Sequence, residues 1–197
     1  MYRIAVTSEK GGVGKSTLAF NLAGALSDRG KVVLVDEDTR IQSCLTWAGL
    51  ASVPFRVLSP EQTRQGVQQA DFLLVDSEGR PSRDDLAEMV GSFDRVLIPC
   101  GVSRLEIGST LALWRALKDP GGVVSVVITK APPVGRVGQD ARDALRAAGV
   151  PCLDAVVRRY AAHERAAEVG GLVRDVRDDR AGEAWADVQA VAAEVVK

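Results

Sequence analysis

Residues 8–17 read Ser-Glu-Lys-Gly-Gly-Val-Gly-Lys-Ser-Thr and stand between an apolar run, Arg3–Val6, and a segment with helical spacing, Lys15–Asp28. Glycine lets the backbone curl so that successive N–H groups point at one anion, and the positive end of the following helix faces the same anion. A glycine-rich turn without a ligand is the alternative, but it does not require Gly-Lys-Ser at the start of the helix. The stretch therefore predicts a phosphate-binding loop.

The residue types around the glycines indicate how a nucleotide would be held. The Lys15 ammonium would reach the β- and γ-phosphates, and the Ser16 hydroxyl would be a ligand of Mg²⁺. The usual pattern has a glycine five residues before the Gly-Lys pair, whereas this chain has Glu9 there, followed by an additional lysine, Lys10. The residues expected to contact the nucleotide are Gly11, Gly12, Val13, Gly14, Lys15, Ser16 and Thr17.

On both sides of this loop, short apolar runs alternate with segments of helical spacing. Continuous runs of Val, Ile and Leu are typical of strands that are covered on both faces, which is the situation in a parallel sheet. The pattern predicts an α/β fold, a doubly wound and mainly parallel sheet with helices on both faces. The expected strands are Arg3–Val6, Val32–Val35, Phe55–Leu58, Phe72–Val75, Val96–Ile98, Val123–Ile128 and Cys152–Val157.

The expected helices end in recognisable ways. Gly30 and Gly149 stand where a left-handed C-terminal cap would follow a helix. The helices are expected at Lys15–Asp28, Pro60–Gln69, Arg83–Val90, Leu105–Lys118, Gln139–Ala148, Ala161–Val169 and Ala181–Val196.

Composition limits the class of protein. The 197 residues, 46% of them hydrophobic, carry 25 basic against 26 acidic side chains, which predicts one domain, residues 1–197, rather than a disordered tail or a coiled coil. The three cysteines form no C-x-x-C pair, as expected in a reducing cytosol. With neither a signal peptide nor a long apolar run, the protein is expected to be soluble and cytoplasmic.

Aspartates follow two of the expected strands. Asp36 and Asp38 come after Val32–Val35, and Asp76 comes after Phe72–Val75. An acid at the tip of a parallel strand lies at the ligand-binding edge of the sheet, where a divalent cation needs oxygen donors. Helix capping or turn formation is the alternative role for these aspartates.

The sequence Lys-Gly-Gly-Val-Gly-Lys-Ser-Thr, residues 10–17, resembles the deviant Walker A loop of the ParA/MinD partition and positioning ATPases, a branch of the P-loop NTPases. The resemblance extends over nearly the whole chain and implies ATP and Mg²⁺ as cofactors. It implies that Lys10 reaches the phosphates bound by the other subunit of an ATP-dependent homodimer. It also implies catalytic roles for Lys10, Lys15 and Asp38, the last orienting the attacking water, and a metal site formed by Ser16, Asp36 and Asp76.

Two loops depart from that family pattern. Where the family continues Asp-Pro-Gln, this chain has Asp38-Thr39-Arg40-Ile41-Gln42, so that either Arg40 replaces the glutamine or a small insertion moves it to Gln42. Where the family follows the second acid with Thr-Pro, this chain has Ser77-Glu78-Gly79-Arg80.

The C-terminal half carries the expectations about partners. From Lys130 to Arg180 ten basic residues stand against eight acidic ones, which is typical of a salt-bridged surface, although arginine also suits phosphate. The resemblance implies nonspecific DNA binding by this half of the ATP-bound dimer, hence association with the nucleoid, and adenine near Thr129 and Pro132–Pro133. The segment Glu183–Lys197 lacks the basic, strongly apolar pattern of a membrane anchor and predicts a helix packed on the sheet.

These observations predict an ATP-dependent dimerising ATPase that partitions chromosomes or plasmids with a ParB-like stimulating protein. One alternative is a positioning ATPase for another cellular cargo. A second is an ATP-dependent synthetase of the dethiobiotin or cobyrinate type, which activates a carboxylate. His163 and the three tryptophans are expected to be packing residues.

Overall fold

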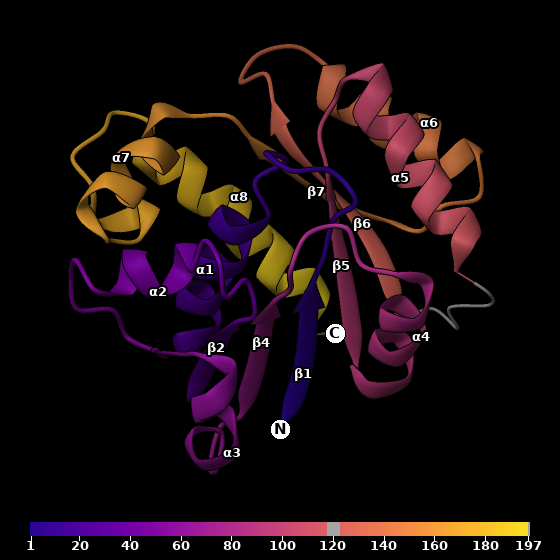
Figure 1. Ribbon diagram of the computed structural model, residues 1–197. Helices are drawn as coiled ribbons and strands as arrows, with labels where there is room; N and C mark the ends of the chain where they lie inside the picture. Colours follow the sequence, from indigo (N-terminus) through magenta and orange to yellow (C-terminus); the bar gives the residue numbers. More distant parts are fainter. Residues whose placement is uncertain (118–122, 197) are drawn as a thin grey trace.

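Within residues 1–117 and 123–196, which the computed structural model describes, seven parallel strands form one sheet in the order β3-β2-β4-β1-β5-β6-β7 (Figure 1). The predicted doubly wound, parallel fold is therefore confirmed. The strands are β1 (Tyr2–Val6), β2 (Val32–Asp36), β3 (Arg56–Leu58), β4 (Phe72–Asp76), β5 (Arg95–Cys100), β6 (Val124–Ala131) and β7 (Cys152–Arg158).

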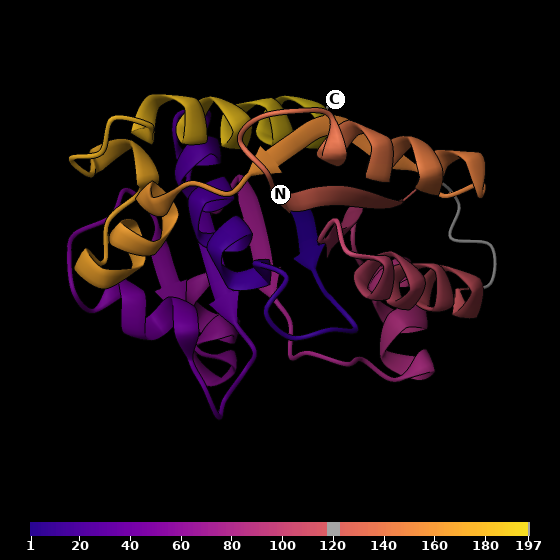
Figure 2. The same ribbon diagram turned by 90° about the horizontal axis from the view of Figure 1, so that it is seen from above.

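The helices lie on both faces of this sheet (Figures 1 and 2). The α-helices are α1 (Lys15–Ser27), α2 (Ser43–Ala48), α3 (Thr63–Gly66), α4 (Arg83–Ser92), α5 (Arg104–Ala116), α6 (Val137–Ala147), α7 (Ala161–Val169) and α8 (Ala181–Val195), and the 3₁₀ helices are η1 (Pro60–Gln62) and η2 (Val173–Asp175). The expected helix end at Lys118 lies outside the described residues.

Two local expectations were wrong, and one short helix was missed. The expected helix Pro60–Gln69 is broken into η1 and α3, which ends at Gly66. The short helix α2 was not expected, because its six residues are too few to show a period. Gly149 does take a positive φ of 81° as a cap, but Gly30 does not. Gly30 is instead needed for space, since a Cβ there would lie 2.7 Å from Asp71 Oδ2.

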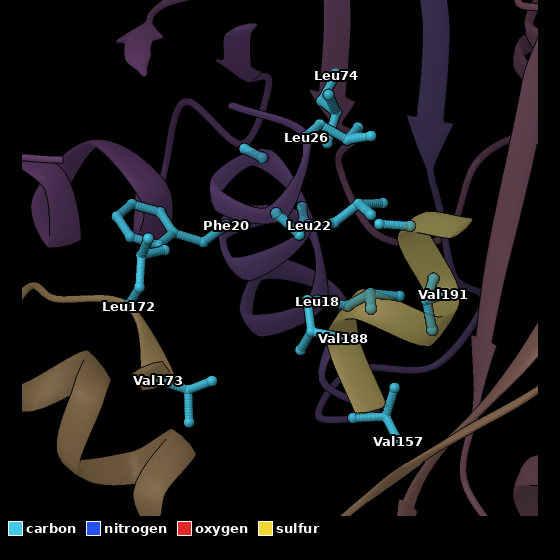
Figure 3. Packing of buried hydrophobic residues seen from close by; sticks show 14 of the residues in the cluster. Leu18, Phe20, Leu22, Leu26, Leu74, Val157, Leu172, Val173, Val188 and Val191 are labelled. Atoms are coloured by element: carbon cyan, nitrogen blue, oxygen red, sulfur yellow. The ribbon is translucent and has the colours of Figure 1, made fainter. Parts of the chain in front are cut away.

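Alternate residues of the central strand β1 serve two separate hydrophobic cores. Ile4 and Val6 join the larger core under α1, α2, α7 and α8, whereas Ala5 joins the core under α4, α5 and α6. In the larger core, residues of α1 pack against Val188 and Val191 of α8 and against Leu172 (Figure 3). Each face of the sheet is thus covered, which is why most residues of the strands are apolar.

The C-terminal helix packs on the sheet, as predicted. Trp185, Val188 and Val191 of α8 are buried in the larger core, and α8 contacts both α1 and β7. Within the described residues, no helix has the length and apolar character that crossing a membrane would require.

Candidate functional site

The glycine-rich loop lies at the carboxyl end of β1, in the middle of the sheet. The chain leaves β1 toward β2 and β4 on one side and later adds β5 on the other, so this point is a topological switch, where ligands of such sheets bind. Gly12 and Gly14 take positive φ values of 81° and 88°, which the loop needs to turn into α1. No side chain caps α1 at Gly14, so the helix presents its first N–H groups to the loop.

A cavity of about 510 Å³ opens beside this loop. A Cβ atom placed on Gly11 or Gly12 would have no neighbour within 4 Å, so the loop leaves room on its surface. The walls combine the loop with residues from three other segments, and they are Ser8, Gly11, Gly12, Gly14, Lys15, Ser16, Thr17, Asp38, Arg40, Ile41, Ser43, Gly79, Arg80 and Lys130.

Lys15 pairs with Asp76 in this structure. The Lys15 ammonium lies 2.6 Å from Asp76 Oδ1, and both side chains are largely withdrawn from solvent. This contact joins the start of α1 to the end of β4. The sequence placed these residues at one edge of the sheet, but their direct contact was not expected.

Asp36 lies directly opposite Asp76 on the neighbouring strand. Its Oδ2 accepts the backbone N–H groups of Cys44 and Leu45 at 2.8 and 3.2 Å, so the carboxylate anchors the start of α2. Burial, reinforced by the nearby charge of Asp76, raises the pKa of Asp36 despite these hydrogen bonds. The capping role considered for this residue is therefore present.

Cys44 lies between the two aspartates. Its Sγ is 3.4 Å from Asp76 Oδ2, and the residue is fully buried. Burial raises the pKa of this thiol well above its ordinary value, with the neighbouring carboxylates acting in the same direction. Cys44 is thus a buried thiol next to the Lys15–Asp76 pair, a position that the sequence did not reveal.

The loop after β2 presents Asp38 and Arg40 to the cavity. Asp38 Oδ1 accepts the backbone N–H groups of Arg40 and Ile41, which closes a tight turn. The Arg40 guanidinium pairs with Glu78 at 2.6 Å. Of the two positions left open by the sequence, Arg40 faces the cavity, whereas Gln42 takes a positive φ of 51° and is not among the lining residues.

Lys10 lies apart from the other predicted site residues. It is exposed, it does not line the cavity, and within the described residues no hydrogen bond or ion pair involves its ammonium. The fold therefore gathers Lys15, Ser16, Asp38 and, through Lys15, Asp76. It leaves Lys10 exposed on the surface, without a hydrogen bond or ion pair to the residues that the structure describes.

A second cavity, of about 160 Å³, adjoins the loop on the side of α7. Thr17 and Leu18 form one wall and Thr129 forms another, where the Thr129 hydroxyl donates a hydrogen bond to the Val13 carbonyl at 2.7 Å. Pro132 and Pro133 do not belong to it, because they line a different cavity beside Arg142.

The remaining walls of the second cavity were missed from the sequence. They come mainly from the end of β7 and from α7, and include Arg158, Arg159, Tyr160 and His163. His163 packs against the protein as expected, and burial lowers the pKa of its imidazole. The order of the strands could have predicted these walls. Because β7 is parallel to β6, its carboxyl end lies at the same edge of the sheet as the loop.

The arginines of the C-terminal half are nearly all engaged in ion pairs. Arg158 binds Asp187 with a distance of 2.6 Å, and Arg165 binds Asp178 at 2.6 Å. The same holds for Arg136, Arg142, Arg146, Arg159, Arg174 and Arg180 with their acidic neighbours. The prediction of a salt-bridged surface is confirmed for these residues.

Comparison with known proteins agrees with this geometry. A family model described as the CobQ/CobB/MinD/ParA nucleotide binding domain matches residues 4–173. The "Maintenance of carboxysome distribution protein A" of Gloeobacter kilaueensis is 34% identical over 202 residues, covering 98% of this chain and 93% of that protein.

Two solved structures illustrate the shared fold. The MinD cell division protein of Aquifex aeolicus aligns with a TM-score of 0.74 at 17% identity, covering 100% of this chain and 97% of its own. An ATP complex of a McdA variant from Cyanothece aligns with a TM-score of 0.72 at 14% identity, covering 100% and 96%. At these identities the likeness concerns the fold.

Proposed function

Because this chain belongs to the CobQ/CobB/MinD/ParA family of nucleotide-binding domains, we propose that it is a ParA-like ATPase that positions a large intracellular cargo. Of the two cargo predictions from the sequence, chromosome or plasmid partitioning and the positioning of another cargo, the second has the better support. The relative that covers 98% of this chain is named for maintaining carboxysome distribution. The proposal takes residues 1–197 as one ATPase domain.

The residues around the larger cavity fit MgATP. The loop leaves open space at Gly11 and Gly12, and no side chain caps the N–H groups at the start of α1. Among the residues that line the cavity, four are basic, Lys15, Arg40, Arg80 and Lys130, and one is acidic, Asp38. An excess of cations suits a triphosphate. Ser16 lines the cavity, and its hydroxyl would be an oxygen donor for Mg²⁺. The Asp36 and Asp76 carboxylates do not line the cavity in this structure; in the proposal they would complete the metal site once the pair of Asp76 with Lys15 opens.

Two side chains are assigned to hydrolysis. Asp38 faces the cavity from the loop after β2, where it would orient the attacking water, while Lys15 would hold the phosphates. The Lys15–Asp76 pair has to open for this, because the ammonium cannot serve Asp76 and the phosphates fully at the same time. The smaller cavity at Thr129 and His163 is the proposed place of the adenine base.

Lys10 is the single observation that carries the dimerising part of the proposal. It stands next to the glycine-rich loop, is exposed, and makes no hydrogen bond or ion pair with the described part of its own chain. A lysine in that position is available to a second copy, where it would neutralise charge developing on the transferred phosphoryl group. The proposed cycle is therefore ATP-driven dimerisation followed by hydrolysis that a partner protein stimulates.

Nonspecific DNA is the proposed track for this cycle, in the cytoplasm and on the nucleoid. Exposed ion pairs contribute little, so paired surface arginines can exchange a carboxylate for a backbone phosphate. Two such surfaces joined in a dimer would bind DNA much more tightly than one. Membrane attachment has no corresponding support, since α8 is buried against the sheet.

Sedimentation with and without ATP and nonspecific DNA, at two salt concentrations, tests the proposal. A dimer is expected with ATP, and DNA co-sedimentation is expected only for that dimer and less at the higher salt. A monomer in saturating ATP would contradict the proposal. The synthetase alternative predicts instead an ATP-dependent amide or ring product from a carboxylic acid, without a need for DNA.

A further inference from the structure

Arg40 and Glu78 connect the two loops that flank the phosphate cavity. Arg40 lies in the loop after β2 and Glu78 in the loop after β4, and their side chains meet at 2.6 Å. Arg40 also lines the phosphate cavity, while Glu78 lines a separate cavity on the other side of the loop after β4, with Asp85 and Glu88. The guanidinium therefore stands at the boundary between a cationic and an acidic cavity.

The pair is easily exchanged. The two side chains are 77% and 57% exposed, and ion pairs with that exposure contribute little to stability. The backbone on both sides is fixed, because Asp38 accepts the Arg40 N–H and the Arg80 N–H binds the Ser8 carbonyl. A change of partner thus requires only rotation of the Arg40 side chain.

The side from which Arg40 enters the cavity favours contact with the terminal phosphate of a bound nucleotide. The glycine-rich loop wraps the inner phosphates of a bound nucleotide, with its helix N-terminus behind them. Arg40 enters from the turn that Asp38 closes, the same side from which Asp38 faces the cavity. A planar guanidinium suits a terminal phosphate, with its several free oxygens, better than a single carboxylate oxygen.

We propose that Arg40 reads the terminal phosphate of the bound nucleotide, leaving Glu78 when a triphosphate is present and returning to it with a diphosphate. Arg40 is then a binding residue that discriminates ATP from ADP, and Glu78 is its competitor. Because Glu78 belongs to the loop after β4, this loop would gain or lose its contact with Arg40 according to which nucleotide is bound. The inference rests on the proposed function, because it requires that MgATP occupies the cavity.

Isothermal titration calorimetry of the full chain with MgATP and with MgADP tests whether Arg40 contacts the terminal phosphate. Arg40→Gln is expected to weaken ATP binding about tenfold and to leave ADP binding within about twofold. Glu78→Gln is expected to strengthen ATP binding about threefold, and this gain should vanish in the Arg40→Gln/Glu78→Gln double variant. Arg29→Gln, an exposed arginine at the opposite edge of the sheet, is the matched control and should change neither affinity.

The same titrations distinguish a failure of ATP binding from a failure of the role of Arg40. If the parent protein binds no ATP, the proposed function fails, and the inference fails with it. If the parent binds ATP and Arg40→Gln changes ATP and ADP affinity equally, or changes neither, only the inference is overturned. Unaltered thermal unfolding of Arg40→Gln shows that the fold is intact in each case.

Discussion

Lys15 and Asp76 form an ion pair that is largely buried at the centre of the site. Asp36 lies opposite Asp76 and the Cys44 thiol lies 3.4 Å from it, so removal of the lysine would leave two carboxylates facing each other without a cation in contact. Breaking a buried pair by removing one partner is costly, because the remaining charge stays desolvated. Lys15 is thus expected to stabilise the fold as well as to bind phosphate.

Lys15→Ala should abolish ATP binding and lower the free energy of unfolding by about 1–3 kcal/mol, less than for a fully buried pair because the site borders a cavity. Urea denaturation and calorimetry measure the two effects. The Lys15→Ala/Asp76→Asn double variant should recover part of the stability without recovering ATP binding. An unfolding free energy equal to that of the parent in Lys15→Ala would contradict the structural role of the pair.

Lys10 is expected to behave in the opposite way. Its side chain is exposed and makes no hydrogen bond or ion pair within the described residues. Lys10→Ala should therefore leave the free energy of unfolding unchanged and the ATP affinity of the monomer within about twofold. ATP-driven dimers should disappear, because each copy would lose its contribution to the phosphates of the other. Light scattering in saturating ATP measures this, with Lys31→Ala as an exposed control. Normal dimers of Lys10→Ala would remove the assignment of Lys10.

At the scale of elements, α2 joins the site to the larger hydrophobic core. Its first N–H groups bind Asp36, and its Trp47 ring stacks on Phe20 of α1 with the ring centroids 4.3 Å apart. Phe20 also meets Phe55 edge-on, at 5.1 Å. One aromatic cluster therefore holds the helix that positions a carboxylate of the site.

Phe20→Ala should lower the free energy of unfolding by about 3–5 kcal/mol, because it opens a cavity at a fully buried ring. Phe20→Leu keeps most of the volume and should cost about 1.5 kcal/mol or less. Denaturation curves measure both. ATP binding should weaken in Phe20→Ala more than in Phe20→Leu, since α2 would no longer be held firmly. A loss below 1 kcal/mol in Phe20→Ala, on the same scale, would show that α2 is held by other contacts.

The sequence was sufficient for the elements whose pattern repeats. The seven strands were found because their apolar runs are covered on both faces. The place of the glycine-rich loop between a strand and a helix was also correct, whereas its binding of phosphate stays a prediction. It was insufficient for α2, Cys44 and the walls of the smaller cavity at Arg158–Tyr160. These depend on which loops meet at the edge of the sheet, which the local pattern does not state. The pairing of Lys15 with Asp76 is likewise a property of the folded edge.

At the scale of the whole molecule, the site lies where the two cores meet. The phosphate loop continues into α1 in the larger core, whereas the loop after β4 leads into α4, whose Leu86 belongs to the second core. The larger cavity is thus lined by loops that lead to helices on both faces of the sheet. In the proposed cycle, a change of nucleotide would therefore act on loops that lead to helices on both faces of the sheet.

Substitution of Asp38 should separate ATP-dependent dimerisation from ATP hydrolysis. Asp38→Ala removes both the carboxylate that would orient water and the acceptor that closes the turn to Arg40 and Ile41, whereas Asp38→Asn keeps an oxygen acceptor for the turn. Both variants should slow ATP hydrolysis about a hundredfold or more. Because neither removes Lys10 or the phosphate loop, both should remain dimers with ATP, and Asp38→Asn should keep the parental ATP affinity.

Single-turnover hydrolysis measures the rate, and light scattering measures dimer formation. Glu37→Gln is the control that should keep its activity, because Glu37 is a neighbouring acid that lines the separate cavity of Glu78. Hydrolysis by Asp38→Asn at the parental rate would move the water-orienting role to another group, whereas a monomeric Asp38→Asn in ATP would show that the turn at Arg40 is itself part of the dimer contact.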